Sequence, residues 1–408
     1  MSSTTGISGF TIYLSTIPSG TDAGKIGYNA DGSTTWTAVT SWPLTLTTSA
    51  TPTLASPLVV SMSTDLTINS TNGGTNGFFK IGNNYTTFEG NNKKVTIDTV
   101  ANYPGLIQNG RNVQMGKNNV TIQNLGVEVN TTGTPSTLAD SGGWIGQSYF
   151  GRNASNNVAN NCYSTGGISN SGSGGIFGRY AGYDSGNASA NNCYSTGGIS
   201  GLYSGGIFGG YAGISGNASA TNCYSTGAIS GTYSGGIFGE GASSNNATNC
   251  YSTGEISGTE SGGIFGRYAG SLGNASANNC YSTGDISGLS SGGIFGSEAG
   301  YSSGNVSATN CYSSGVISSG ADGIGFPDNS ATTYNLLNVY VANGNWHDSL
   351  AQGILSWFPA SSPGSNFVWT SCGTDTPYLL TAFNTNNYSP SFVYDSTLTT
   401  GNYTTSAG

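Results

Sequence analysis

A block of about 30 residues repeats along the middle of the chain and constrains its fold more than any other feature. Residues 205–235 read GGIFGGYAGISGNASATNCYSTGAISGTYSG, and near-copies run from residue 142 to residue 325. One cysteine marks each copy, at spacings of 31, 30, 27, 30 and 31 residues: Cys162, Cys193, Cys223, Cys250, Cys280 and Cys311. A period of this length is typical of a solenoid, in which each unit buries its apolar side against its neighbours.

The composition favours an ordered all-β protein without nucleic-acid or membrane partners. Of 408 residues, 67 are Gly and only 7% are charged, and the apolar residues are regularly placed, unlike the highly charged composition of disordered chains. The net charge is −9, whereas phosphate binding needs clustered positive charge. No apolar run reaches the roughly 18 residues of a membrane span, and the N-terminus has no recognisable signal peptide. We therefore expect either cytosolic synthesis or an export signal of another kind, and we favour the first.

Strand alternation predicts which residues of each repeat face inward. Cys223 and Ile229 are expected inside and Tyr224 outside, because neighbouring strand residues point to opposite faces. The paired glycines before Ile207 are expected to turn a corner with positive φ. Asn222 and its counterparts are expected to stack and share side-chain amide hydrogen bonds along the rod. The outward aromatic ladder, a candidate interface, comprises Tyr163, Tyr194, Tyr224, Tyr251, Tyr281 and Tyr312.

The six repeat cysteines are interpreted as a structural ladder of reduced, inward thiols. The chain has seven Cys, an odd number, so at least one thiol is unpaired within the chain. Disulfides between neighbouring coils are the second reading, although in-register side chains leave the Cβ atoms slightly too far apart. Zinc is the third, since a column of like residues cannot surround an ion tetrahedrally. We predict no cofactor and no metal site.

The repeat divides the chain into five segments. We predict a right-handed parallel β-helix of about 9–11 coils, closed by caps because open sheet ends expose backbone groups. The segments are residues 1–43, a β-rich N-terminal cap or assembly segment; 44–141, degenerate coils; 142–325, the clear repeats; 326–383, a C-terminal cap with one short helix over residues 348–356; and 384–408, an extended arm.

The repeats resemble GLUG-type repeats of large surface and adhesin-like proteins. The resemblance rests on a GG-apolar-apolar-G corner followed by N-C-Y-x-T-G, found at residues 174–178 with 192–197, 205–209 with 222–227, and 262–266 with 279–284. It covers about 45% of the chain (residues 142–325). The stretch TDTPYLLTAF at 374–383 is similar to the tails of β-helix proteins from large DNA viruses of protists. These resemblances imply a scaffold or surface role, on a virion or an extracellular surface, without catalytic residues.

Few residues offer catalytic chemistry. Glu255 and Asp285 occupy one repeat position on adjacent coils, a separation that resembles a retaining glycosidase pair, but both flank Gly on an expected solvated edge. Glu240 and Arg267 share another position. His347, the single histidine, precedes Asp348, but sequence neighbours rarely form a triad. Asn-x-Ser/Thr sequons recur with the repeat at Asn153, Asn187, Asn217, Asn246, Asn274 and Asn305, where turn chemistry also explains them.

The sequence therefore predicts a non-enzymatic structural protein that assembles with copies of itself into a fibre, tubule or outer layer. The first alternative is an adhesin that binds glycans or a receptor through the tyrosine column, because exposed aromatic surfaces usually mark interaction sites. The second is a polysaccharide lyase or hydrolase, which would want clustered carboxylates with Ca²⁺ and a basic residue.

Overall fold

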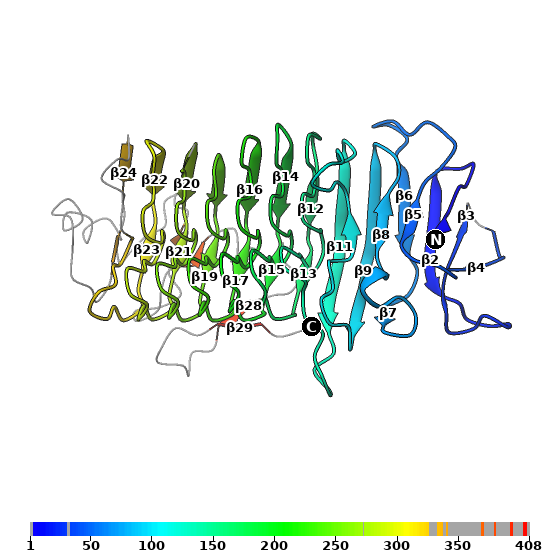
Figure 1. The fold of residues 1–408 in the computed structure, drawn as a ribbon, viewed down its shortest axis with the longest axis horizontal. Coiled ribbons are helices and arrows are strands. Elements are labelled where there is room, and N and C mark those ends of the chain that lie inside the picture. Colours follow the sequence, from blue (N-terminus) through cyan, green and yellow to red (C-terminus); the bar gives the residue numbers. More distant parts are fainter. Residues whose placement is uncertain are drawn as a thin grey trace.

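The computed structural model describes residues 3–30, 33–271 and 273–325, and six short strands beyond residue 325. It is an all-β parallel solenoid of about nine turns with an N-terminal sheet region. Figure 1 shows the strands stacked side by side along the long axis of an elongated molecule. In one parallel ladder, nine successive coils each contribute one strand: β6, β9, β11, β12, β14, β16, β18, β20 and β22. The right-handed sense stays a prediction.

Three parallel ladders form the sides of the solenoid. The first contains β2 (Thr11–Thr16), β6 (Leu58–Met62), the first part of β9 (Thr86–Asp98) and of β11 (Val120–Val129), β12 (Val158–Asn160), β14 (Asn187–Asn191), β16 (Asn217–Thr221), β18 (Asn245–Thr248), β20 (Asn274–Asn278), β22 (Asn305–Thr309) and β24 (Thr333–Leu337).

The second ladder carries the tyrosines. It contains β7 (Leu66–Asn69), the second part of β9 and of β11, β13 (Tyr163–Ser164), β15 (Tyr194–Ser195), β17 (Tyr224–Ser225), β19 (Tyr251–Ser252), β21 (Tyr281–Ser282), β23 (Tyr312–Ser313) and β25 (Tyr340–Val341). The third contains β1 (Ser3–Thr4), β5 (Leu44–Leu46), β8 (Phe79–Ile81) and β10 (Ile107–Gln108), and continues as single-residue bridges from Gly146 through the phenylalanines of the GGIFG corners.

Parallel stacking begins before the expected boundary at residue 44. Strands β1 and β2 already pair in parallel with β5 and β6. The other side of β2 is covered by an antiparallel strand, β3 (Ile26–Ala30), which pairs in turn with β4 (Thr37–Ala38). This antiparallel addition occupies the backbone groups that would otherwise form an open edge.

The remaining described elements are short. One 3-10 helix, η1, spans Gly74–Asn76. Beyond the solenoid, β26 (Trp369–Thr370) pairs with β27 (Leu379–Leu380), and β28 (Phe392–Tyr394) pairs with β29 (Tyr403–Thr405), both antiparallel. The predicted helix over residues 348–356 lies outside the described residues, as do most of the predicted cap and arm. In the described part of the chain, no helix is long and apolar enough to cross a membrane.

The glycine corners differ from the prediction. Gly205 and Gly206 do not have positive φ. A Cβ on Gly206 would instead lie 2.0 Å from the carbonyl oxygen of Gly236 and 2.7 Å from the Cβ of Ser225. Glycine is therefore required there because successive coils approach closely, not because the backbone turns into the left-handed region.

Candidate functional surfaces

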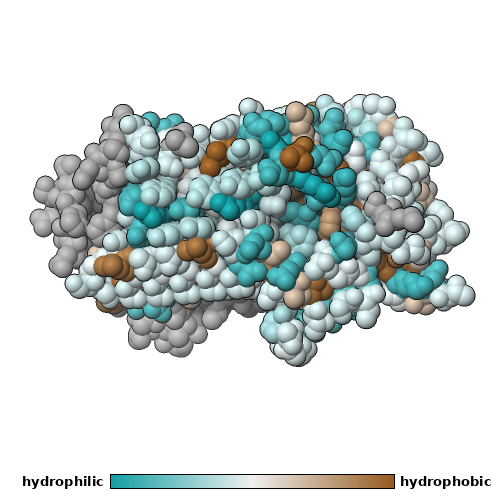
Figure 2. Space-filling view, in the orientation of Figure 1, coloured by the Kyte–Doolittle hydropathy of each residue, from teal (hydrophilic) through white to brown (hydrophobic). Residues whose placement is uncertain are grey.

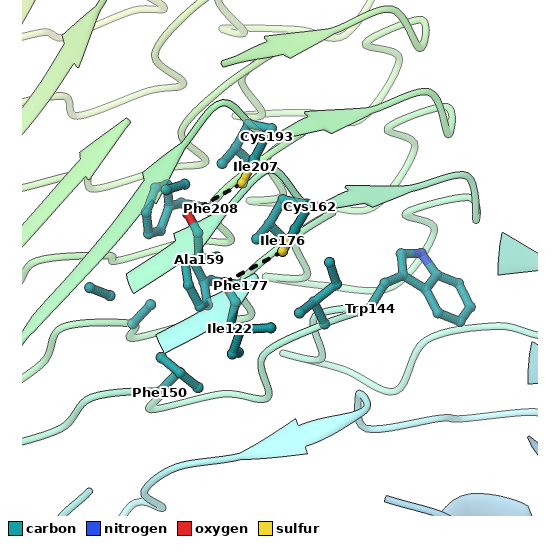
Figure 3. Packing of buried hydrophobic residues seen from close by; sticks show 14 of the residues in the cluster. Ile122, Trp144, Phe150, Ala159, Cys162, Ile176, Phe177, Cys193, Ile207 and Phe208 are labelled. Carbon is teal, nitrogen blue, oxygen red and sulfur yellow. Dashed lines mark hydrogen bonds between the residues drawn. The ribbon is translucent and has the colours of Figure 1, made fainter. Parts of the chain in front are cut away.

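The cysteine ladder lies in the core. All six repeat cysteines are buried and present as free thiols. Figure 3 shows Cys162 and Cys193 beside Ile176, Phe177, Ile207 and Phe208, each thiol bonded to the coil before it. Cys193 Sγ donates to the carbonyl of Ala159 at 3.4 Å. Burial raises the pKa of the Cys223, Cys250 and Cys280 thiols well above the usual value, which keeps them protonated and poorly nucleophilic.

The tyrosine ladder is stacked, but most of it is not exposed. Successive rings lie 4.8–5.1 Å apart with interplanar angles of 2–8°. Tyr163 and Tyr194 are half-buried, whereas Tyr224, Tyr251 and Tyr281 are at most 1% exposed and Tyr312 is 4% exposed. The predicted exposed aromatic column is therefore wrong for four of the six residues. Alternation decides on which side of a strand a ring lies, but it does not decide whether that side meets water.

The tyrosine ladder begins at a charged pair. The ring of Tyr163 lies against Gly126 of the preceding coil, where a Cβ would meet its Cζ at 2.3 Å. Its hydroxyl donates to Glu128 at 2.9 Å, and Lys94 pairs with the other Glu128 oxygen at 2.7 Å. Burial, and next the bond to Glu128, raise the pKa of Tyr163, while burial raises the pKa of Tyr194 to about 12. Both phenols are therefore neutral near pH 7.

The asparagine ladder is present as predicted. From Asn161 onward, each side-chain Nδ2 donates to the Oδ1 of the asparagine one coil earlier, at 3.0 Å throughout, while Asn124 Nδ2 donates to Glu89. All members have φ between 52° and 55°, a region that asparagine tolerates better than most residues. The ladder comprises Asn124, Asn161, Asn192, Asn222, Asn249, Asn279 and Asn310. It joins seven coils by continuous amide bonding and also fixes their corner conformation.

A column of arginines, tyrosines and carboxylates follows the GGIFG corners. The guanidinium carbon of Arg179 lies 4.7 Å from the ring centroids of both Tyr180 and Tyr211. The equivalent carbon of Arg267 lies 4.7 Å from the Tyr233 ring centroid and 4.2 Å from that of Tyr268. Such cation–π contacts hold the arginines in place.

Carboxylates complete this arginine–tyrosine column. Arg267 forms ion pairs with Glu260 at 2.8 Å and Glu298 at 2.7 Å. Glu240, one coil before Arg267 at the same repeat position, is only 3% exposed, and burial raises the pKa of its carboxyl. Glu240 and Arg267 share a repeat position in the sequence, but the column to which they belong was not predicted from it. The sequence feature that could have revealed the column is the position directly after each GGIFG motif, which varies between repeats. It is occupied by Arg179, Gly210, Glu240, Arg267 and Ser297.

The first ladder presents a face that we call the polar sheet face. It consists of the more exposed alternate residues of five strands: Asn187, Ser189, Asn191, Asn217, Ser219, Thr221, Asn246, Thr248, Asn274, Ser276, Asn278, Asn305, Ser307 and Thr309. None of these residues is charged. The sequon residues Asn217, Asn246, Asn274 and Asn305 are exposed, whereas Asn153 and Asn187 are half-buried. Several members bond along the axis, such as Ser219 to Ser189 at 2.9 Å.

The candidate catalytic residues are not assembled into a site in the described part of the chain. Glu255 and Asp285 are both exposed, and Asp285 accepts a bond from the backbone of Val316 at 2.8 Å. His347 lies outside the described residues. Among the described residues, no group of three or more His, Cys, Asp or Glu side chains could hold a metal ion.

Comparisons of the sequence with known families and curated proteins assign the chain to no family. No protein-family description and no curated protein match the sequence. Among solved structures, the fold is similar to one named as a candidate immunoglobulin A1 protease from Bacteroides ovatus, at 19% sequence identity. The alignment covers 81% of this chain and 93% of that one, with a TM-score of 0.33. This similarity is too low to carry an argument about function.

Proposed function

We propose that this chain is a non-enzymatic structural rod that assembles with copies of itself. The observation that carries the proposal is that its ladders pair each side chain with its counterpart in the next coil. The ring centroids of successive corner phenylalanines lie 4.8–5.4 Å apart and those of the tyrosines 4.8–5.1 Å apart, and the asparagines bond at 3.0 Å. Such contacts stiffen the solenoid along its axis, and they engage these side chains within the chain.

The polar sheet face supports self-association. Its amides and hydroxyls both donate and accept hydrogen bonds, so two identical faces can satisfy one another. The face carries no charge, so two copies that meet through it place no like charges in direct contact, although the chain has a net charge of −9. Figure 2 shows a surface that is mainly polar, with apolar residues as separate spots, so a large hydrophobic interface is not visible on that side. Because four of its six tyrosines are buried, we do not propose the tyrosine column as the assembly surface.

The proposal extends to the handedness of the solenoid, the type of its repeat, its location and its partner. We infer a right-handed, GLUG-like β-helix that acts on a virion or an extracellular surface after cytosolic synthesis. Its partner is a second copy of the chain rather than nucleic acid or a membrane. The GLUG-like motifs at residues 174–178 and 192–197 support a surface role, and the TDTPYLLTAF stretch supports a viral setting.

Electron microscopy of the purified protein tests the assembly. We expect ordered fibres, tubules or sheets that share one repeat distance and lengthen with protein concentration. Monodisperse single rods across a wide range of concentration, salt and pH would contradict the proposal.

A further inference from the structure

A surface pocket lies at the N-terminal end of the solenoid, away from the repeats. It has a volume of about 540 Å³, within the usual range of about 300–1,000 Å³ for small-molecule sites. Its walls come from the start of β3, from residues 39–42 before β5, and from residues 70–73 and 76 around η1. Neither the repeats nor the proposed rod function accounts for it.

Trp42, the aromatic residue of the pocket lining, is held in place by a contact with Phe79. Trp42 lines the pocket and remains partly exposed. Its ring meets the fully buried Phe79 edge to face, with centroids 5.6 Å apart. Tryptophan combines a large apolar face with one polar N–H group, which suits a ligand that is apolar on one side and wet on the other. The contact with Phe79 fixes the ring orientation before any ligand arrives.

The part of the lining formed by residues 70–73 and 76 is polar, and internal hydrogen bonds hold it in place. The Oδ1 atom of Asn69 accepts bonds from the backbone amides of Thr71 and Asn72 at 3.0 Å each, and from the Thr71 hydroxyl at 2.7 Å. Asn72 closes the same loop by donating to Thr67 at 2.8 Å and accepting from the Asn69 amide at 2.8 Å. These bonds fix the loop but use the Thr71 hydroxyl hydrogen and one N–H of the Asn72 side chain. A ligand would meet the remaining lone pairs of that hydroxyl and the second N–H of that amide in a fixed arrangement, which lowers the entropy cost of binding.

The charge of the pocket points to a neutral ligand. Lys25 is the charged residue of the lining, and it pairs with Asp22 at 2.7 Å. The other polar groups of the lining are neutral hydroxyls and amides: Thr40, Ser41, Ser70, Thr71, Asn72 and Asn76. A ligand with one apolar face and several hydroxyls fits both walls, and this is the chemistry of a neutral sugar ring.

We propose that this pocket binds one neutral hexose unit of a carbohydrate, with the sugar face against Trp42 and its hydroxyls toward the 70–76 loop. The sugar end of the molecule would then be distinct from the polar sheet face that mediates assembly. Because one ring contact and a few hydrogen bonds hold the ligand, we expect dissociation constants near the millimolar range for single sugars.

Saturation-transfer NMR and calorimetry on the full chain provide the test, with methyl glucoside, galactoside, mannoside and N-acetylglucosaminide as neutral probes and methyl glucuronide as the acidic probe. At least one neutral probe is expected to bind, and W42A should weaken its binding about tenfold or more. The matched control is W36A, because Trp36 is a half-buried tryptophan of the same segment that does not line the pocket. T40W fills the pocket from an exposed position without removing the Trp42–Phe79 contact, so it separates lost binding from lost folding.

Binding that is lost in W42A and T40W but kept in W36A supports the proposal. No binding of any probe, or binding that survives T40W, overturns it. Binding of methyl glucuronide alone, abolished by K25M, also overturns it by showing an acidic ligand. Electron microscopy is expected to give the same result for T40W and for the natural chain, so failure of one proposal does not affect the other.

Discussion

The repeats and the N-terminal coils fill the same kind of interior in two different ways. In the N-terminal coils, long strands such as β9, with 13 residues, bury large side chains, among them Phe88, Val95 and Ile97. In the repeats, strands of 2–5 residues bury alanines such as Ala218 and Ala220, and bulk comes from single Phe and Ile residues at the corners. Both regions bury these side chains almost completely, so in the repeats the corner Phe and Ile residues supply the bulk that strand side chains supply in the N-terminal coils.

The two kinds of core differ in how strongly they fix the alignment of one coil with the next. A strand lined with alanine, glycine and serine specifies its register weakly, because a slip loses little packing. The repeats compensate with ladders that match only when coils are aligned: stacked rings, and asparagines bonded at 3.0 Å. In the N-terminal coils, the shapes of large side chains serve the same purpose. The comparison thus predicts that close backbone approach and ladder bonds dominate stability in the repeats.

The largest effect is expected at the glycine corner. G206A would place a Cβ 2.0 Å from the Gly236 oxygen and should destabilise the repeats by roughly 4 kcal/mol or more, because both clashing groups are backbone or fixed by it. G198A is the matched control, since its nearest neighbour would be the Ala228 oxygen at 4.0 Å, and should stay within about 0.5 kcal/mol. Urea unfolding measures both. Equal stability of the two variants would refute the close-approach explanation.

The asparagine ladder should give an intermediate effect. N249G keeps the conformation that φ 54° demands but removes the bond to Asn222 and the bond from Asn279, so we expect a loss of about 1–2 kcal/mol. N249A should lose roughly 1–2 kcal/mol more, because alanine is strained in the left-handed region. In the N-terminal coils, N102G is the control: Asn102 has φ 55°, is exposed and shows no side-chain bond in the described part. If N102G costs as much as N249G, the bonds contribute nothing.

The smallest effect concerns pH. Burial raises the pKa of Glu240, partly opposed by a hydrogen bond from Tyr211 and by Arg267 and Arg179, and reinforced by Glu260. A raised folded-state pKa means that stability is full below the unfolded pKa of about 4.3 and is lost as pH rises through the folded value. E240Q removes this loss. Its stability relative to the natural chain should increase from acid to neutral pH, as read from urea midpoints. A difference that shrinks with rising pH would show that the arginines dominate.

Much of the fold could be predicted, because a repeat of fixed length imposes the same local structure on every coil. The buried cysteines and the asparagine bonds follow from strand alternation and stacking. The burial of Tyr224 does not, since strand alternation assigns the ring to one side of the strand but does not say whether that side meets water. The arginine–tyrosine column was missed because its residues vary between coils, and the Trp42 pocket was missed because separate non-repeating segments build it.

The most direct test of the structural role is sedimentation velocity on two matched double variants. S189E/S219E places two carboxylates on adjacent coils of the polar sheet face, and S200E/S230E places two on adjacent coils at exposed positions elsewhere. Equal melting temperatures would show that both remain folded. The account predicts that S189E/S219E sediments as single rods while S200E/S230E assembles like the natural chain. Assembly of both variants, or of neither the variants nor the natural chain, would contradict it.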